Sequence, residues 1–108
     1  MGRRATATRG LPARRIAERD EIVAAAGFRR DHSLAWGDYL YIDDLVTLQA
    51  YRGRGHASRL LRWVADEGQR LGCNQLHLDS GPQRHEAHRL YLTRGYHIAA
   101  YHFATVVR

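Results

Sequence analysis

The spacing of apolar residues predicts a long helix in the middle of the chain. Between His56 and Leu71, apolar or small residues recur at steps of three and four positions, as they do on one face of a helix. These residues are Ala57, Leu60, Leu61, Val64, Gly68 and Leu71. Gly72 follows the last of them and is typical of a helix C-terminus. The pattern therefore predicts a helix over 56–71 that buries one face.

The segment before this helix is predicted to be a strand followed by a turn. Tyr39 to Leu48 is rich in Leu, Tyr, Ile, Val and Thr, which favour strands. Gln49 to Gly55 is polar and contains Gly53 as well, which is typical of a turn. A strand, a glycine-rich turn and a helix start bring unpaired backbone N–H groups together at the positive end of a helix dipole. Such a place suits a phosphate or diphosphate group.

A turn that binds no ligand is the alternative interpretation, because glycine-punctuated turns are common. The sequence contains no Gly-Lys-Ser/Thr, so the turn is not a P-loop. A G-x-G-x-x-G series is also absent, since its third position falls on Ser58. Arg52 and Arg54 place positive charges beside the glycines. These residues alone do not decide between an anion-binding turn and a turn that binds no ligand.

Weaker patterns predict the elements before and after this region. Glu21 to Arg30 fits a helix by its alanines and a strand by its Ile-Val and Gly-Phe pairs. Ile16 to Asp20 fits a short helical fragment, and Leu34 to Trp36 starts a strand between two turns. After the long helix, Gln75 to Leu78 alternates polar and apolar residues and is predicted to be a strand parallel to 39–48.

The last third of the chain is predicted to contain a helix and a strand. The helix begins at Arg84 or His85, ends at Arg94 before Gly95, and carries apolar residues on one face. These are Ala87, Leu90 and Tyr91. Tyr96 to Val107 is rich in β-branched and aromatic residues, which predicts a last strand.

Two motifs, in order, resemble the GCN5-related N-acetyltransferase superfamily. The segment 52–57, RGRGHA, matches its Arg/Gln-x-x-Gly-x-Gly/Ala signature, and the strand IDDLVTL precedes it. Further on, LHLDSGPQRHEAHRLYLTRGY resembles the second half of the superfamily. The resemblance covers Ile22 to Phe103 and decides for a strand at Glu21 to Arg30. It implies an α/β fold, with a mixed, mostly antiparallel sheet, a central parallel strand pair and two flanking helices.

The start of the chain departs from the family pattern. Members usually begin with a strand and two helices that wall the acceptor side, whereas residues 1–15 contain Gly, Thr, Ala and Arg without an apolar period. We therefore expect a flexible arginine-rich arm over 1–15 and a single acetyl-CoA-binding domain over 16–108. The acceptor site would then be open, or completed by a partner subunit such as a second copy in a homodimer, or the chain would be truncated.

The distribution of charge bears on possible binding partners, and the cysteine content bears on the cellular compartment. The net charge is +6, and the arginines that precede the first acid, Glu18, account for nearly all of it. They are Arg3, Arg4, Arg9, Arg14 and Arg15. A nucleic-acid-binding tail is one interpretation, and a short solvated arm is the one that we favour. Cys73 is the only cysteine, which fits a reducing cytoplasm, and no apolar run approaches the ~20 residues of a membrane span.

The resemblance implies a reaction and a set of cofactor-binding residues. Acetyl-CoA would be the cosubstrate, and an amine would attack its thioester directly in a ternary complex. The turn residues Arg52, Gly53, Arg54, Gly55, His56 and Ala57 would hold the diphosphate through backbone N–H groups. Val46, Thr47 and Leu48 would pair with the amide arm of the cofactor, and one N–H would stabilise the oxyanion. A complete sheet ladder is the alternative. Arg84 would reach a carbonyl or a phosphate.

The catalytic acid and base are predicted from residue type and position. Asp43 and Asp44 interrupt an apolar strand, and adjacent strand residues face opposite sides, so only one of them faces the cleft. We prefer Asp44 as the base; a carboxylate bound to an arginine, or a water relay, is the alternative. Tyr91 aligns with a tyrosine of the family, and a phenol with a pKa of ~10 can protonate the thiolate. Core packing is its alternative role.

One motif resembles a metal site. The run 85–89, HEAHR, is close to HExxH, but the position of the second histidine is held by Arg89. No third ligand is suggested, so we expect no metal. Two further hypotheses differ from the transferase: an inactive or truncated member that binds acyl-CoA, and a basic nucleic-acid-binding module.

Overall fold

The computed structural model describes residues 13–107, which divide into two compact units. The first unit ends at Leu78 and the second begins at Asp79. The first contains strands β1 (Ala13–Glu18), β2 (Glu21–Ser33), β3 (Gly37–Thr47) and β4 (Gln75–Leu78), the 3-10 turn η1 (Gln49–Tyr51) and helix α2 (His56–Arg70). The second contains helix α3 (His85–Thr93). Within the described part, no helix is long and apolar enough to cross a membrane.

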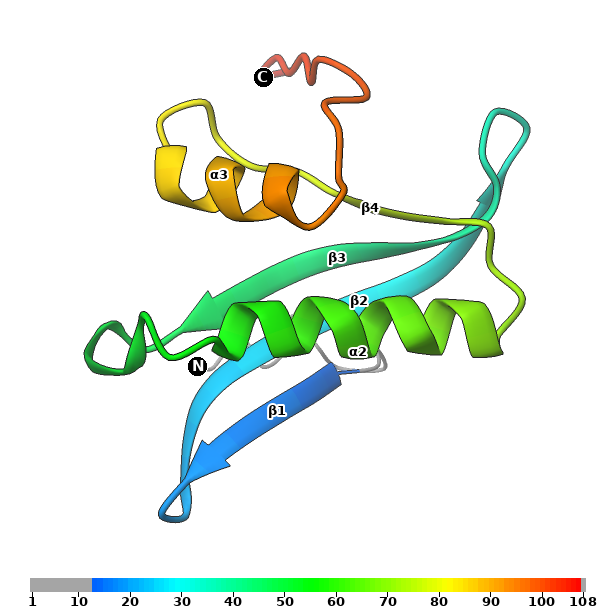
Figure 1. Cartoon of the computed structure of the whole chain (residues 1–108). Coiled ribbons are helices and arrows are strands. Elements are labelled where there is room, and N and C mark those ends of the chain that lie inside the picture. The colour runs from blue at the N-terminus through cyan, green and yellow to red at the C-terminus, as the bar shows by residue number, and fades with distance from the viewer. Residues whose placement is uncertain (1–12, 108) are drawn as a thin grey trace. The chain divides into compact units, whose positions relative to one another are not determined.

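The first unit is a mixed four-stranded sheet with α2 lying across one of its faces (Figure 1). The strand order is β1-β2-β3-β4; β1 and β3 are antiparallel to β2, and β4 is parallel to β3. The predicted parallel pair on either side of the long helix is therefore confirmed. Only Tyr39 to Ile42 of β3 pair with β4, so the rest of β3 extends beyond the end of its parallel neighbour.

A β-bulge lies where β3 leaves β4. Gly27 of β2 is opposite Asp44, but the next residue, Phe28, is opposite Ile42. Asp43 is therefore the extra residue of the bulge, which bends the strand and increases its twist. This bulge breaks the alternation of faces along β3, so the strand pattern alone does not determine which of the two aspartates faces the cleft.

The core of the first unit lies between α2 and the sheet. It consists of Val23, Ala24, Ala26, Phe28, Tyr39, Leu40, Ile42, Leu60, Leu61 and Val64, all buried. Trp63 of α2 packs on Phe28, with ring centroids 5.9 Å apart. Gly68 lets the helix approach closely, because a Cβ at this position would be 3.2 Å from Leu40 Cδ1. The apolar face predicted for the helix is thus the face that is buried.

Helix α2 ends one residue before the predicted limit, in a hydrogen-bonded C-terminal motif. The N–H of Cys73 donates to the Gly68 carbonyl at 2.8 Å, and that of Gly72 donates to Gln69 at 3.1 Å. Gly72 has a φ of +82°, which is the left-handed conformation of the Schellman motif. The predicted stop at Gly72 is confirmed.

The prediction of a helical fragment at Ile16 to Asp20 is wrong. Ala13–Glu18 forms strand β1, so Arg14 and Arg15 belong to the sheet and not to the expected arm; the rest of that arm lies outside the described residues. Arg19 and Asp20 link β1 to β2 and both have positive φ, 50° and 68°, as a type I′ hairpin turn requires. Pairing with β2, which local propensity does not encode, decides for the strand.

Two further strand predictions are wrong. Leu34 to Trp36 form the turn between β2 and β3, in which the Trp36 N–H donates to Ser33 Oγ at 3.0 Å. Residues 96–107 form no strand, and the side chains of Ile98 and Phe103 are largely exposed. Apolar, β-branched composition makes a strand only where a neighbouring edge is available to pair with it. As a result β4 is an edge of the sheet among the described residues.

Candidate functional site

The C-terminal half of β3 presents backbone groups on the side that β4 leaves open. The Leu48 N–H donates to the Val23 carbonyl at 2.8 Å, so Leu48 directs its backbone toward β2. Alternate residues of an antiparallel strand point to opposite neighbours. Thr47 therefore directs its N–H and C=O away from β2, beyond the end of β4. Of the three residues predicted to line the cofactor, Thr47 is the one whose backbone faces the open edge; Val46 and Leu48 face β2.

The turn after β3 has the geometry of an anion site. Gly53 and Gly55 have φ values of +79° and +84°, which side chains disfavour. Gly55 is the N-cap of α2 and no side chain caps the helix. The first amide to donate within the helix is that of Arg59, to the Gly55 carbonyl at 3.1 Å. The N–H groups of His56 and Ala57 therefore have no acceptor inside the helix, at the positive end of its dipole.

The two arginines of the turn already have partners in the protein. Arg52 donates from Nε to the Thr47 carbonyl oxygen at 3.3 Å, which connects the turn to the open end of β3. Arg54 donates to Glu18 Oε1 at 2.8 Å, and its guanidinium lies 4.8 Å from the centre of the Tyr51 ring. Each guanidinium has five N–H donors and uses one of them in these contacts, so both the backbone N–H groups and the two arginines have donors available to an anion.

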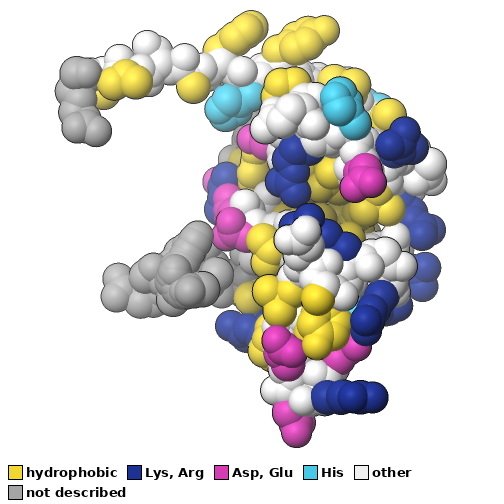
Figure 2. Space-filling model, turned by 90° about the vertical axis from the view of Figure 1, so that its left-hand side faces the viewer, with side chains coloured by type: hydrophobic (Ala, Val, Ile, Leu, Met, Phe, Trp, Pro, Cys, Tyr) yellow, Lys and Arg dark blue, Asp and Glu magenta, His cyan; other side chains and the backbone are white. Residues whose placement is uncertain are grey.

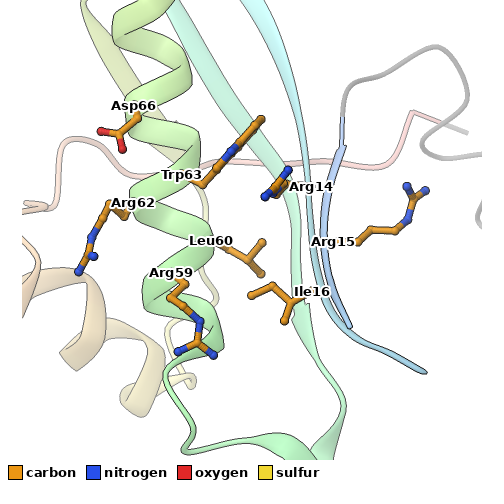
Figure 3. Close-up of a pocket in the computed structure, with 8 residues that line it drawn as sticks. All are labelled: Arg14, Arg15, Ile16, Arg59, Leu60, Arg62, Trp63 and Asp66. Atoms are coloured by element: carbon orange, nitrogen blue, oxygen red, sulfur yellow. The ribbon is translucent and has the colours of Figure 1, made fainter. Parts of the chain in front are cut away.

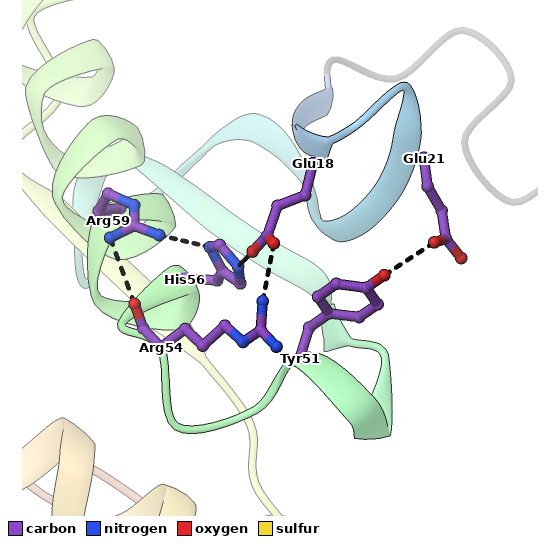
Figure 4. Close-up of polar contacts among 6 residues, drawn as sticks. All are labelled: Glu18, Glu21, Tyr51, Arg54, His56 and Arg59. Carbon is purple, nitrogen blue, oxygen red and sulfur yellow. Dashed lines mark hydrogen bonds and ion pairs between the residues drawn. The ribbon is translucent and has the colours of Figure 1, made fainter.

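A side-chain cluster that the sequence did not predict surrounds this turn (Figure 4). Glu18, at the end of β1, accepts from Arg54 through one oxygen and bonds His56 Nε2 through the other, at 2.7 Å. The other ring nitrogen of His56 bonds the Arg59 guanidinium. His56 is 4% exposed, and it is the only buried polar residue among those that the structure describes. Glu18 and His56 are 38 positions apart, and no local pattern connects them.

A small pocket opens beside this cluster, and the face around it carries both signs of charge. The pocket has a volume of about 260 Å³ and is lined by Glu18, Arg19, Tyr51 and Arg54. Figure 2 shows basic and acidic side chains interleaved with apolar ones on the face that it presents. At the pocket itself, Glu18 lies with Arg19 and Arg54, which differs from the single-sign stripe that is typical of nucleic-acid binding.

The two predicted base candidates differ in their surroundings. Asp43 Oδ1 accepts from Arg29 Nε at 3.2 Å, and Arg29 also bonds Asp31 at 3.3 Å and lies 4.6 Å from the Tyr41 ring centre. Asp43 is therefore a carboxylate bound to an arginine, which was the alternative role. Asp44 is half-buried and lies opposite Gly27, which has no side chain to cover it.

The predicted acid, Tyr91, and the predicted cofactor contact, Arg84, belong to the second unit. Arg84 is the N-cap of α3, and Tyr91 lies near the end of that helix. Burial raises the pKa of the Tyr91 phenol, and the positive charge of Arg84 opposes this shift in part. The Tyr91 ring lies 6.0 Å from that of Tyr96, whose pKa burial raises to about 12. Tyr91 is thus fully protonated at neutral pH, as an acid must be.

The histidines of the HExxH-like run do not converge on a metal site. His88 Nε2 is 2.7 Å from the Gly81 carbonyl oxygen, and its ring centre is 6.2 Å from that of His85. Within the described part of the chain, no group of three His, Cys, Asp or Glu side chains could hold a metal ion.

A second pocket, of about 310 Å³, lies between β1 and α2 (Figure 3). Its lining contains Arg14, Arg15, Ile16, Arg59, Leu60, Arg62, Trp63 and Asp66. Arg14 lies over the Trp63 ring, 4.9 Å from its centre, and Ile16 and Leu60 point toward each other. None of the catalytic or cofactor-binding residues predicted from the sequence lines this pocket.

Comparison with known families is consistent with the open edge of β3, the glycine turn and the start of α2 described above. The profile of the acetyltransferase (GNAT) family matches residues 4–96. The chain belongs to this family. The resemblance that the two sequence motifs indicated is therefore confirmed, and the remaining comparisons describe relatives within the family or with the same fold.

Two curated relatives are 36% identical to the chain over part of its length. One is an uncharacterized N-acetyltransferase, YhdJ, from Bacillus subtilis (strain 168), matched over 80% of this chain and 61% of its own length. The other is the aminoalkylphosphonate N-acetyltransferase of Salmonella typhimurium (strain LT2), matched over 57% of this chain and 40% of its own length. The chain thus spans less than two thirds of either relative.

Solved structures share the fold at lower sequence identity. An aminoglycoside acetyltransferase from an uncultured soil metagenomic sample has a TM-score of 0.80 and 24% identity, covering 91% of this chain and 66% of its own. The aminoglycoside N-acetyltransferase AAC(6′)-Iy, solved in complex with CoA, has a TM-score of 0.81 and 18% identity, covering 91% and 76%. These similarities confirm the predicted fold class.

Proposed function

We propose that this chain transfers an acetyl group from acetyl-CoA to an amine. The observation that supports this most directly is the open edge of β3 beside the first turn of α2. Thr47 directs its backbone to that edge, and Arg52 links its carbonyl to the turn that carries the unpaired amides. A thioester cofactor in which a diphosphate is followed by an amide arm matches these two groups in kind and in order.

In this proposal the two ends of the cofactor are held by different elements. The N–H groups of His56 and Ala57, with those of the preceding glycine turn, bind the diphosphate at the positive end of the helix dipole. The amide arm continues along β3 and pairs with Thr47 as an added strand would. The side chains of Val46 and Leu48 are about half exposed, and they supply apolar surface along that path.

The reaction is a direct displacement at the thioester carbonyl. The amine nitrogen attacks the carbonyl carbon, a C–N bond forms, and the C–S bond breaks as the tetrahedral intermediate collapses. A backbone N–H at the end of β3 stabilises the negative oxygen, a contribution that is typically ~3 kcal/mol. The nitrogen loses one proton, and the departing sulfur gains one. Amide and free CoA are the products.

We assign the proton transfers to two side chains. Asp44 takes the proton from the amine, directly or through a water, from a half-buried position opposite Gly27, which has no side chain to cover it. Tyr91 gives a proton to the thiolate, because its raised pKa keeps the phenol protonated at neutral pH. Arg84 contributes positive charge near Tyr91 and is proposed to contact the cofactor.

The experiment that tests this function has two steps. Isothermal titration with acetyl-CoA should detect specific binding, and CoA should then be released in the presence of a panel of amines that includes aminoglycosides and aminoalkylphosphonates. Binding without release would identify an acyl-CoA-binding protein that lacks turnover. Absence of binding would remove the proposal, and salt-sensitive binding to DNA or RNA instead would favour the nucleic-acid hypothesis.

A further inference from the structure

The side chains around the phosphate-binding turn form a closed ring of contacts. Arg54 donates to Glu18 Oε1 at 2.8 Å, and Glu18 Oε2 is 2.7 Å from His56 Nε2. His56 Nδ1 bonds Arg59, and Arg59 donates back to the Arg54 carbonyl oxygen at 3.4 Å. The ring, visible in Figure 4, closes through Arg54, whose guanidinium and backbone carbonyl oxygen both belong to it. We call these four residues the turn clamp.

The clamp fixes the protonation of the buried imidazole. A guanidinium has only donors, so Arg59 requires His56 Nδ1 to be an acceptor. The ring proton must then be on Nε2, from which it is donated to Glu18. A doubly protonated ring would turn a second N–H toward Arg59. Arg59 and Glu18 together therefore hold the ring in one tautomer and one orientation.

His56 is also the first residue of α2, so its ring and its backbone N–H move together. The ring is 4% exposed and held at both nitrogens, which leaves the residue little freedom to rotate. Gly55, just before it, has a φ of +84° and adds no side chain that could fix the turn. The geometry of the amides that bind the diphosphate thus depends on the His56 side chain and on the carboxylate that holds it.

We propose that Glu18 is a positioning residue of the phosphate-binding turn, acting on the turn amides through His56 and Arg54. The inference rests on the proposed function, because it concerns the same diphosphate. The inference and simple electrostatics predict opposite changes in CoA affinity when Glu18 is replaced. Glu18 is an anion beside an anion site, so charge alone predicts that its removal strengthens CoA binding. Positioning predicts that its removal weakens CoA binding.

The test compares CoA with a ligand that lacks the diphosphate. Wild-type and Glu18→Gln proteins are titrated with CoA, and their KM values for acetyl-CoA and acetyl-pantetheine are measured. Gln retains an acceptor for His56 but turns an amide N–H₂ toward Arg54, so it breaks the ring without leaving a void. We expect the Kd for CoA to rise about tenfold, as for the loss of one charge-assisted hydrogen bond. The KM for acetyl-pantetheine should stay unchanged.

Glu21→Gln is the matched control. Glu21 follows the same hairpin turn, and it accepts from the Tyr51 hydroxyl at 3.0 Å instead of contacting the helix start. The substitution Glu21→Gln removes the same charge as Glu18→Gln. The Glu21→Gln variant should bind CoA at least as tightly as the wild type. Circular dichroism checks that both variants fold, and nitrogen NMR should show a changed chemical shift of His56 Nε2–H in Glu18→Gln only, because its acceptor is then an amide oxygen instead of a carboxylate.

The outcomes separate the inference from the proposed function. If wild-type protein binds no CoA, the proposed function fails. If wild-type protein binds CoA and Glu18→Gln binds it equally or more tightly, the function stands and the positioning role is overturned. Equal losses for acetyl-CoA and acetyl-pantetheine would also overturn it, because they would indicate general damage. A Glu18→Gln variant that fails to fold would assign Glu18 to stability and overturn it as well.

Discussion

The carboxylate of Asp43 is bound to the Arg29 guanidinium, with 3.2 Å between Oδ1 and Nε. Asp43 is also the extra residue of the bulge in β3, where Gly27 and Phe28 face Asp44 and Ile42. The bulge and the ion pair together give Asp43 a structural partner on its own side of the sheet. The two adjacent aspartates therefore have different surroundings, which their adjacent positions in the sequence do not reveal.

This difference predicts different effects of two matched substitutions. Asp44→Asn should lower kcat/KM by about 10²- to 10⁴-fold, because it removes the general base while leaving its size unchanged. Asp43→Asn should have a much smaller effect and should mainly weaken the contact with Arg29. Steady-state kinetics with acetyl-CoA and a reactive amine measure both. Full activity in Asp44→Asn would remove the proposed base and favour a water relay.

The strand, the turn and the long helix could be predicted from the sequence because local signals define each of them. Periodic leucines mark the buried face of α2, and Gly72 supplies the positive φ at its end. The parallel pairing of β3 with β4 followed from the helix between them. The strand, turn and helix start that carry the candidate site therefore agree with the predicted elements.

The remaining features depend on contacts between distant segments. Strand β1 exists because β2 pairs with it, and residues 96–107 remain without a strand in spite of a composition that favours one. The bulge at Asp43 and the contact of Glu18 with His56 are likewise tertiary features. No spacing in the sequence encodes them, since each joins residues from separate elements.

The positive φ of Gly55 gives a second prediction. Gly55→Ala should cost about 1–2 kcal/mol of stability, because a Cβ disfavours the left-handed conformation. It should also weaken CoA binding, since the turn amides would shift. Gly72→Ala is the control: Gly72 has nearly the same φ, +82° against +84°, but lies at the opposite end of the helix. Gly72→Ala should lower the thermal stability by a similar amount and leave the affinity for CoA unchanged. If Gly55→Ala and Gly72→Ala bound CoA equally well, the assignment of the Gly55 turn to diphosphate binding would be contradicted.

The close contact between Gly68 and Leu40 gives a third prediction. A Cβ at Gly68 would already be 3.2 Å from Leu40 Cδ1, so a branched side chain has no room unless α2 moves away from the sheet. Gly68→Val should destabilise the protein by about 1–3 kcal/mol, the usual cost of overpacking. Denaturant unfolding measures this. Asp66→Val, at an exposed position of the same helix, controls for the helix propensity of valine.

Alkaline pH gives a fourth prediction through Tyr96. Burial raises the pKa of this phenol from 10.0 to about 12. The folded state therefore retains a proton that the unfolded state has lost, so stability is complete below pH ~10 and falls as the pH rises toward 12. Tyr96→Phe should flatten this fall in unfolding measurements between pH 9 and about 12. Tyr101→Phe, at a largely exposed position, should leave it unchanged.

The phenol of Tyr91 gives the last prediction, which concerns catalysis. Burial raises its pKa above 10.0, so the acid form persists throughout the neutral range and turnover should decline only at higher pH. Tyr91→Phe should lower kcat by about 10²- to 10⁴-fold with little change in CoA affinity, since it deletes the proton donor and little else. It should also remove the alkaline decline in kcat. Tyr96→Phe, whose ring centre is 6.0 Å away, should retain turnover at neutral pH. If Tyr91→Phe kept full turnover, the leaving thiolate would take its proton from water, and Tyr91 would be a packing residue of the second unit.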